Sequence, residues 1–127
     1  MQDGRIDTIV SDHACCAEED KGEDLWKALP GFGGTALLYP YLFSEGHLRR
    51  GLGLIRVAEL ASANPARAFG LYPRKGAIAV GSDADLTVLD TSQRRTVRAQ
   101  DLHESDYTPW EGKEVGAWPR SPCCAAR

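Results

Sequence analysis

The chain has 127 residues, enough for one domain with a modest hydrophobic core. Its composition, 43% hydrophobic and 26% charged, is typical of a globular protein rather than of a disordered or fibrous one. The formal net charge of −3 comes from 18 acidic and 15 basic residues that form no block of one sign, so neither nucleic acid nor an anionic membrane is expected as a partner.

No apolar stretch approaches the roughly 20 residues of a membrane-spanning helix. The first residues lack a basic region followed by an apolar one, so no secretory signal is predicted and a cytoplasmic location is expected. The four cysteines form two adjacent pairs, Cys15-Cys16 and Cys123-Cys124. Adjacent cysteines are poorly placed to share one tetrahedral zinc ion, and disulfides are not expected in the cytoplasm.

A β-rich apolar run over residues 6–10 is followed directly by Asp12 and His13. This pattern predicts a buried parallel strand that delivers a carboxylate to a cleft, because catalytic groups gather at the carboxyl ends of such strands. Asp12 is therefore a candidate catalytic residue. The alternative is an ordinary strand followed by a polar turn in which Asp12 only begins the loop.

A polar, acidic loop is expected over residues 14–23, and residues 24–29 can form one helical turn. The next segment contains Gly31, Gly33 and Gly34. Glycines allow backbone N–H and C=O groups to approach a ligand closely. The alternative is a simple linker between helices.

Residues 35–45 are apolar on nearly every face, which predicts a buried helix. Gly46 is a plausible carboxyl-terminal cap for this helix. His47 then follows as a cation suited to a helix end, and it is expected at the surface rather than as a ligand.

A second helix is expected from about residue 54 to residue 62. Asn64 and Pro65 predict the start of a third, short helix, because Asn is a strong N-cap and Pro suits the first helical position. This helix should end at Gly70.

From residue 76 the composition changes from helical to β. Strands are predicted over residues 85–90, 95–97 and 114–118. Asp83 and Asp85 resemble metal ligands in isolation, but they fit a turn better.

Taken in order, these segments resemble the carboxyl-terminal portion of a cyclic amidohydrolase. The branch contains hydantoinases (dihydropyrimidinases), allantoinases and dihydroorotases. The resemblance covers residues 5–116 and is carried by six pieces in register: Ser11 to Ala14, Leu42 to Gly46, Asn64 to Leu71, Tyr72 to Gly76, Gly81 to Leu86, and Asp106 to Gly112. Residues 24–34 are closer to the allantoinase and dihydroorotase side.

The resemblance implies an α/β fold class, with this chain as the carboxyl-terminal fragment of a (β/α)8 TIM-type barrel. Residues 1–75 would hold barrel strand eight and the following helices, and residues 76–116 would form short strands of a small β-sandwich and a loop. Residues 117–127 depart from the family pattern and read like an out-of-frame tail.

The resemblance also implies the chemistry. Asp12 would bind a divalent metal, zinc by family analogy, and act as general base and then as proton donor to the leaving amide nitrogen. Gly31, Gly33 and Gly34 would border the substrate, a small cyclic amide such as allantoin, dihydroorotate or a hydantoin.

A catalytic zinc site usually has three protein ligands, and this chain has three histidines and no His-x-His pair. The fragment should therefore be inactive without an amino-terminal barrel portion as its partner. The family suggests that the parent enzyme is a homo-oligomer.

Two alternatives to an active parent stay open. One is an amidohydrolase homologue without activity that serves in protein assembly, although a scaffold would have no need of Asp12. The other is an independent small α/β domain, which is disfavoured because nothing in the chain supplies parallel partners for residues 6–10.

Overall fold

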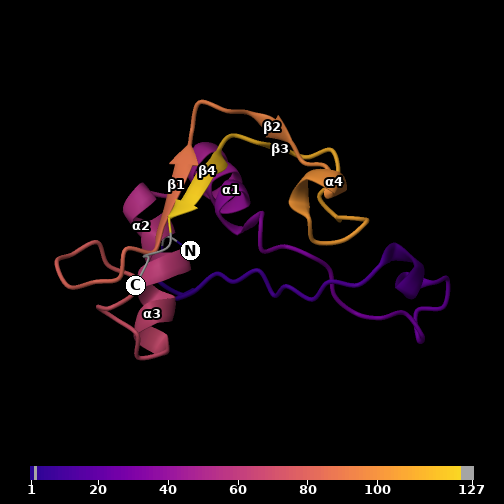
Figure 1. Ribbon diagram of the computed structural model, residues 1–127, viewed down its shortest axis with the longest axis horizontal. Coiled ribbons are helices and arrows are strands. Elements are labelled where there is room, and N and C mark those ends of the chain that lie inside the picture. The colour runs from indigo at the N-terminus through magenta and orange to yellow at the C-terminus, as the bar shows by residue number, and fades with distance from the viewer. Residues whose placement is uncertain (2, 124–127) are drawn as a thin grey trace.

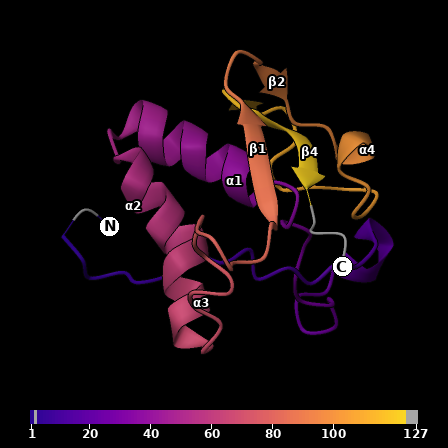
Figure 2. The same ribbon diagram turned by 60° about the vertical axis from the view of Figure 1, so that its left-hand side comes forward.

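The computed structural model describes residue 1 and residues 3–123. Two long helical rods and two antiparallel strand pairs are connected by extended loops (Figures 1 and 2). The first rod is α1 (Leu38–Tyr41) with the π-helical turns Leu42–Arg49 that continue it. The second rod joins α2 (Leu54–Ala58), the π-helical turn Glu59–Ala63 and α3 (Asn64–Ala68).

The first rod confirms the predicted buried helix but not its predicted end. Gly46 lies inside the rod, and a Cβ there would contact Leu42 Cδ1 at 3.2 Å and Leu52 Cδ2 at 3.4 Å. The cap prediction for Gly46 was wrong because Leu52 packs closely against this position. The rod ends at Arg50, and Gly51 follows with φ of 68°. His47 is half-buried rather than at the surface, with Nδ1 2.8 Å from Leu52 O.

The second rod continues without a break through Asn64, so the predicted start of a separate helix at this residue was wrong. Ala63 has helical angles (φ −68°, ψ −41°), so Asn64 is not an N-cap. Pro65 cannot donate a backbone hydrogen bond, and the wide turn before it accommodates this loss. Asn64 instead donates from Nδ2 to Asp7 O at 2.8 Å. The predicted end at Gly70 is confirmed by its φ of 68°.

The strands form two separate pairs. β1 (Leu86–Asp90) is antiparallel to β4 (Trp118–Cys123), with a register irregularity between Val88 and Leu89. β2 (Arg95–Thr96) is antiparallel to β3 (Glu114–Val115), and α4 (Ala99–Leu102) lies between them in sequence.

Strands are therefore present near residues 85–90 and 95–97 as predicted, but the single strand predicted over residues 114–118 is divided between β3 and β4, which pair with different partners. Each pair has only two strands, so the described residues contain no complete β-sandwich. Residues 118–123 of the predicted tail belong to β4, whereas residues 124–127 lie outside the described part of the chain.

Two small clusters form the core. One joins the start of the first rod to the β region through Leu37, Val97, Leu102 and Val115. The other joins the two rods through Leu42, Leu52, Val57 and Leu60. Partly buried Ile9 packs on the second cluster, so the amino-terminal segment is attached to the rods.

Residues 6–10 are extended, but they are not a strand within the described part of the chain. A strand needs a neighbour to complete its hydrogen bonds, and the ladders of the described residues do not include this segment. Val10 is consequently 68% exposed. One backbone bond, from Ile9 N to Leu60 O at 3.0 Å, ties the segment to the second rod.

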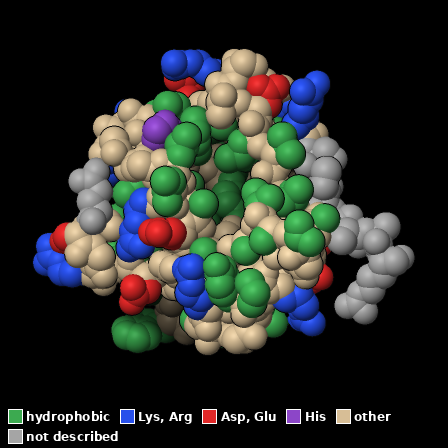
Figure 3. All heavy atoms as spheres, turned by 90° about the vertical axis from the view of Figure 1, so that its left-hand side faces the viewer, with side chains coloured by type: hydrophobic (Ala, Val, Ile, Leu, Met, Phe, Trp, Pro, Cys, Tyr) green, Lys and Arg blue, Asp and Glu red, His purple; other side chains and the backbone are tan. Residues whose placement is uncertain are grey.

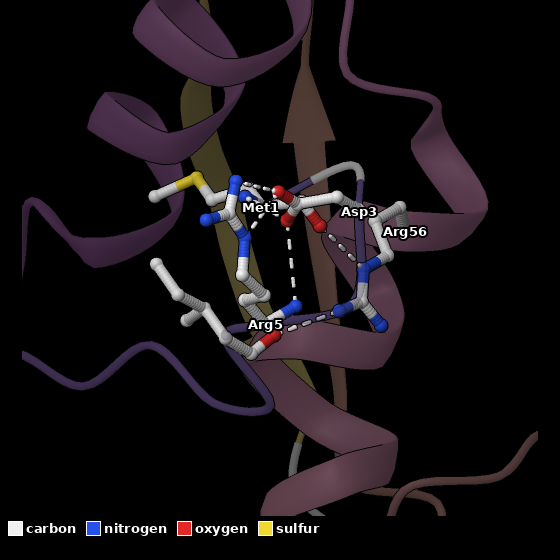
Figure 4. A network of polar contacts seen from close by, with 5 residues as sticks. Met1, Asp3, Arg5 and Arg56 are labelled. Carbon is white, nitrogen blue, oxygen red and sulfur yellow. Dashed lines mark hydrogen bonds and ion pairs between the residues drawn. The ribbon is translucent and has the colours of Figure 1, made fainter.

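Arg56 holds the start of this segment against the second rod (Figure 4). Its Nη2 donates to Ile6 O at 2.7 Å, and its Nε donates to Met1 O at 3.2 Å. Asp3 lies nearby and pairs with Arg5, whose Nε is 2.6 Å from Asp3 Oδ2. These contacts set the direction in which residues 6–13 leave the rods (Figure 1).

Many large apolar side chains stay exposed, among them Ile55 at 79% and Phe69 at 78%. On one face, hydrophobic side chains gather around a hollow (Figure 3). No helix among the described residues is both long and apolar enough to cross a membrane.

Candidate functional site

Asp12 follows the extended amino-terminal segment and has a backbone angle that is unusual for a residue with a side chain. Its φ is 49°, one of two positive values at non-glycine residues among the described residues. Its side chain is exposed, and no hydrogen bond or ion pair forms between its carboxylate and another described residue. Asp tolerates this left-handed conformation better than most residues, and such backbone angles concentrate at functional sites.

The glycine segment lies directly beside the residues that flank Asp12. Ala14 N donates to Phe32 O at 3.0 Å. A Cβ on Gly34 would be 3.3 Å from Ser11 O, and one on Gly31 would be 2.6 Å from Ala14 O. A side chain at Gly31 would therefore force the two backbones apart, and one at Gly34 would make a tight contact.

His13 connects the two segments through its ring. Gly34 N and Thr35 N point at His13 Nδ1, at 3.2 and 3.4 Å. Because Nδ1 accepts these bonds, the proton of the neutral ring belongs on Nε2. Nε2 lies 3.2 Å from Cys15 Sγ.

Cys15, His13 and Glu104 lie in a row that superficially resembles a nucleophile, a base and an orienting acid. The arrangement does not fit that chemistry, because a ring that carries its proton on Nε2 cannot take one from the thiol. Desolvation raises the pKa of Cys15, and the negative charge of Glu104 raises it further. Cys15 therefore stays a thiol at neutral pH.

The carbonyl oxygen of Gly31 is turned toward the protein. It accepts hydrogen bonds from the Tyr107 hydroxyl at 3.0 Å and from Lys21 Nζ, and Cys16 Sγ is 3.6 Å away. Hydrogen bonding of the Lys21 ammonium to the Tyr107 side chain is the largest cause of a raised pKa at Lys21, and hydrogen bonding to the Cys16 side chain is the next largest. Gly31 has φ of 102°, which only glycine adopts without strain.

Glu104 lies against Gly33. Its side chain is 9% exposed, and Oε1 accepts a hydrogen bond from Ala36 N at 2.7 Å. Oε1 is 3.7 Å from His13 Nδ1. Oε2 is buried without a hydrogen-bond partner among the described residues, and it would be 2.6 Å from a Cβ on Gly33.

The structure thus places the neighbours of Asp12, namely Ser11, His13 and Ala14, against the glycine segment. The sequence interpretation gave no role in this region to His13, Glu104 or Tyr107, although His13 lies in the Ser11 to Ala14 piece. For Tyr107 a signal existed, because it lies in the Asp106 to Gly112 piece of the family resemblance. Gly33 and Gly34 are buried and Gly31 is half-buried, so the edge of the segment rather than its whole length is accessible.

An apolar hollow of about 350 Å³ adjoins the site. Ser11 and Gly34 line it, together with Val10 and with Leu37, Tyr41 and Trp110 from the core. Val10 is the exposed edge of the extended segment. The hollow therefore lies where this segment lacks neighbours.

The described residues do not themselves form a metal centre. They contain no group of three or more His, Cys, Asp and Glu side chains that could hold a metal ion. Asp83 and Asp85 both pair with Lys75 at a turn, which agrees with their interpretation as turn residues. Cys15 and Cys16 are free thiols, whereas Cys124 and the side chain of Cys123 lie outside the described part of the chain.

Solved structures with a fold similar to this chain are a hydantoinase and a dihydropyrimidinase by name. A D-hydantoinase matches with a TM-score of 0.92 and 34% identity, and the match covers 97% of this chain and 28% of the other. The dihydropyrimidinase from Brevibacillus agri matches with a TM-score of 0.92 and 32% identity over the same shares.

Curated relatives agree with the structures. The dihydroorotase of Halobacterium salinarum is 42% identical over 120 residues, which are 94% of this chain and 28% of the relative. The allantoinase of Rubrobacter xylanophilus is 42% identical over 112 residues, 87% and 24% of the two chains. The D-phenylhydantoinase of Escherichia coli is 38% identical over 118 residues, 88% and 25% of the two chains.

The Amidohydrolase family matches residues 1–125, and the chain belongs to this family. The resemblance seen in the sequence is therefore confirmed. The chain spans about a quarter of the length of these relatives, from 24% to 28%.

Proposed function

We propose that this chain is the carboxyl-terminal piece of a metal-dependent hydrolase that cleaves a ring C–N bond in a small cyclic amide. The relatives are named for dihydroorotate, allantoin and hydantoins, and these define the substrate class. The residues 24–34 favour the allantoin and dihydroorotate side of that class.

The observation that carries the proposal is the position of Asp12. Its carboxylate is exposed on a residue with positive φ, beside a glycine segment whose Gly31 leaves no room for a Cβ. A carboxylate so placed can accept a proton from an attacking water and return it to the leaving amide nitrogen. The substrate would lie along the edge of the Gly31–Gly34 segment.

The metal-binding set of the complete enzyme must come mainly from outside this chain. Asp12 is the one ligand that this chain is proposed to contribute, because the described residues lack a cluster of three donors. A bound divalent metal, zinc by analogy with the family, would polarise the amide carbonyl and make water a better nucleophile.

A chimaera tests the proposal. Residues 1–123 of this chain replace the matching quarter of the Escherichia coli D-phenylhydantoinase, and hydantoin hydrolysis is measured with and without Asp12→Asn. The chimaera should hydrolyse hydantoin. The Asp12→Asn substitution should lower kcat by at least about a thousandfold, which corresponds to about 4 kcal/mol of added activation barrier. Circular dichroism should show that the variant stays folded, because Asn keeps the shape of Asp and tolerates the same backbone angles.

A folded chimaera in which Asp12→Asn retains near-normal turnover would show that this carboxylate is not the base. A chimaera that folds, binds metal and assembles with its own copies but has no activity would favour the alternative, a homologue that acts in protein assembly. The chimaera with the relative's own segment restored is the positive control.

A further inference from the structure

Four consecutive side chains, Glu104 to Tyr107, each bind the backbone of the segments that frame the site. Glu104 Oε1 accepts from Ala36 N at 2.7 Å, and Tyr107 donates to Gly31 O at 3.0 Å. Ser105 Oγ donates to Cys16 O at 2.6 Å, and Asp106 Oδ1 accepts from Glu18 N at 3.0 Å. We call these four side chains the 104–107 clamp.

The clamp contacts fall on both sides of the site. Those of Ser105 and Asp106 fix the chain that leaves Asp12, at Cys16 and Glu18. The contact of Tyr107 fixes the glycine segment at Gly31, where it begins, and the contact of Glu104 fixes the chain at Ala36, two residues after the segment ends.

We infer that the 104–107 clamp is a positioning element, which sets the distance between Asp12 and the Gly31–Gly34 segment without touching the substrate. This inference rests on the proposed function of those two segments. The side chains bind backbone groups, so they fix main-chain positions rather than the rotamers of neighbouring side chains.

The burial of Glu104 supports a positioning role over a ligand-binding one. Its carboxylate is 9% exposed, and its Oε2 lies against Gly33. A buried carboxylate oxygen without a partner is costly. The bond to Ala36 N, just before the first rod, offsets part of this cost, because helix amino termini favour negative charge.

The test is amide hydrogen exchange, measured by NMR, on the 127-residue chain. Glu104→Ala removes the acceptor for Ala36 N and should speed exchange of the Ala36 amide about fivefold or more, the effect of one lost hydrogen bond. Glu104→Gln keeps an acceptor oxygen and should restore most of the protection.

Tyr107→Phe removes the hydroxyl that fixes Gly31 and should speed exchange at Ala14, whose N–H bonds to Phe32 O. The matched control is Tyr39→Phe, whose hydroxyl lies 2.7 Å from Ser62 Oγ in the second rod. The control should leave the Ala14 amide unchanged. The Val57 amide, bonded to Gly53 O in the second rod, should keep its protection in every clamp variant.

Two results would overturn the inference. One is exchange at unprotected-peptide rates at Glu18 and Ala36 in the wild-type chain. The other is an equal loss of protection at Val57 in the clamp variants, because these residues would then only support global stability. The test needs no turnover, so its failure leaves the proposed function standing, and an inactive chimaera leaves the clamp standing.

Discussion

Position 12 has two requirements that few residue types meet together: a backbone with positive φ and a side chain that can carry a proton. A φ of 49° is strained for most side chains, whereas a proton carrier needs a carboxylate. Asp and Asn are among the few residues other than glycine that accept such angles. The exposed carboxylate therefore stands at a point where the chain allows few substitutes.

Gly33 offers a test of whether the substrate lies along the glycine segment. In the active chimaera, Gly33→Val should raise KM at least about tenfold, about 1.4 kcal/mol of lost binding, because a side chain would intrude on the ligand. Gly53→Val is the matched control, because nothing lies within 4 Å of a Cβ at that glycine.

A second variant is needed to separate an effect on the substrate from an effect on Glu104, which lies beside Gly33. A Cβ on Gly33 would also press on Glu104 Oε2. If Gly33→Val combined with Glu104→Ala recovers the wild-type KM, the effect passes through Glu104 and the glycine does not border the substrate. We expect the double variant to stay impaired.

At the scale of elements, Ser44 joins the first rod to the segment that links β3 and β4. It is 6% exposed, and its hydroxyl donates to Pro40 O at 2.7 Å and accepts from Gly116 N at 2.7 Å. Ser44→Ala leaves a buried N–H without a partner and should lower the free energy of unfolding by about 1–3 kcal/mol. Chemical denaturation measures this loss.

The control for Ser44 is Thr91→Ala, an exposed position at the turn after β1. It should change the free energy of unfolding by less than about 0.5 kcal/mol. Equal effects of the two variants would contradict a special role for the Ser44 hydroxyl.

Asp106 makes the clamp sensitive to acid. The hydrogen bond from the backbone N–H of Glu18 lowers the pKa of Asp106 below its ordinary value of 3.8. Its stabilising contribution is therefore complete above that value and is lost as the pH falls through the lower pKa of the folded state.

Denaturation at a series of pH values measures this contribution. The difference in free energy of unfolding between the wild type and Asp106→Asn should be largest above pH 3.8 and should shrink below it. A difference that does not change with pH would mean that the carboxylate charge plays no part.

Local sequence patterns predicted elements better than they predicted boundaries. The strand at residues 85–90 and the end of the second rod at Gly70 follow from local composition, and both are present. Asn64 has the local pattern of an N-cap, but its amide binds Asp7 O, 57 residues away. Gly46 has the pattern of a helix end, but the packing of Leu52 decides its role. Neither contact can be predicted from the residue types directly beside Asn64 and Gly46.

The candidate site also combines residues suggested by the sequence with residues that only the folded structure reveals. Asp12 and the three glycines could be proposed as site residues from their residue types and from the family resemblance. Glu104 could not, because its importance depends on burial and on a contact with Ala36 that spans 68 residues.

At the scale of the whole molecule, the site is incomplete within the described residues. Purified 127-residue chain should therefore show no hydrolysis of hydantoin, allantoin, dihydrouracil or dihydroorotate, and it should bind zinc only weakly. Turnover assays with added metal and zinc titration calorimetry check this. Metal-dependent turnover by the chain alone would contradict the proposal that the remaining ligands come from elsewhere.

The clamp also has a consequence for the order of folding. Its four contacts join residues that lie 68 to 89 positions apart, whereas the rods are built from neighbours in sequence. Closing so long a loop costs chain entropy before any contact is gained, so local structure forms first. The rods should therefore fold early, and the frame around Asp12 should be completed last and open first when the chain unfolds.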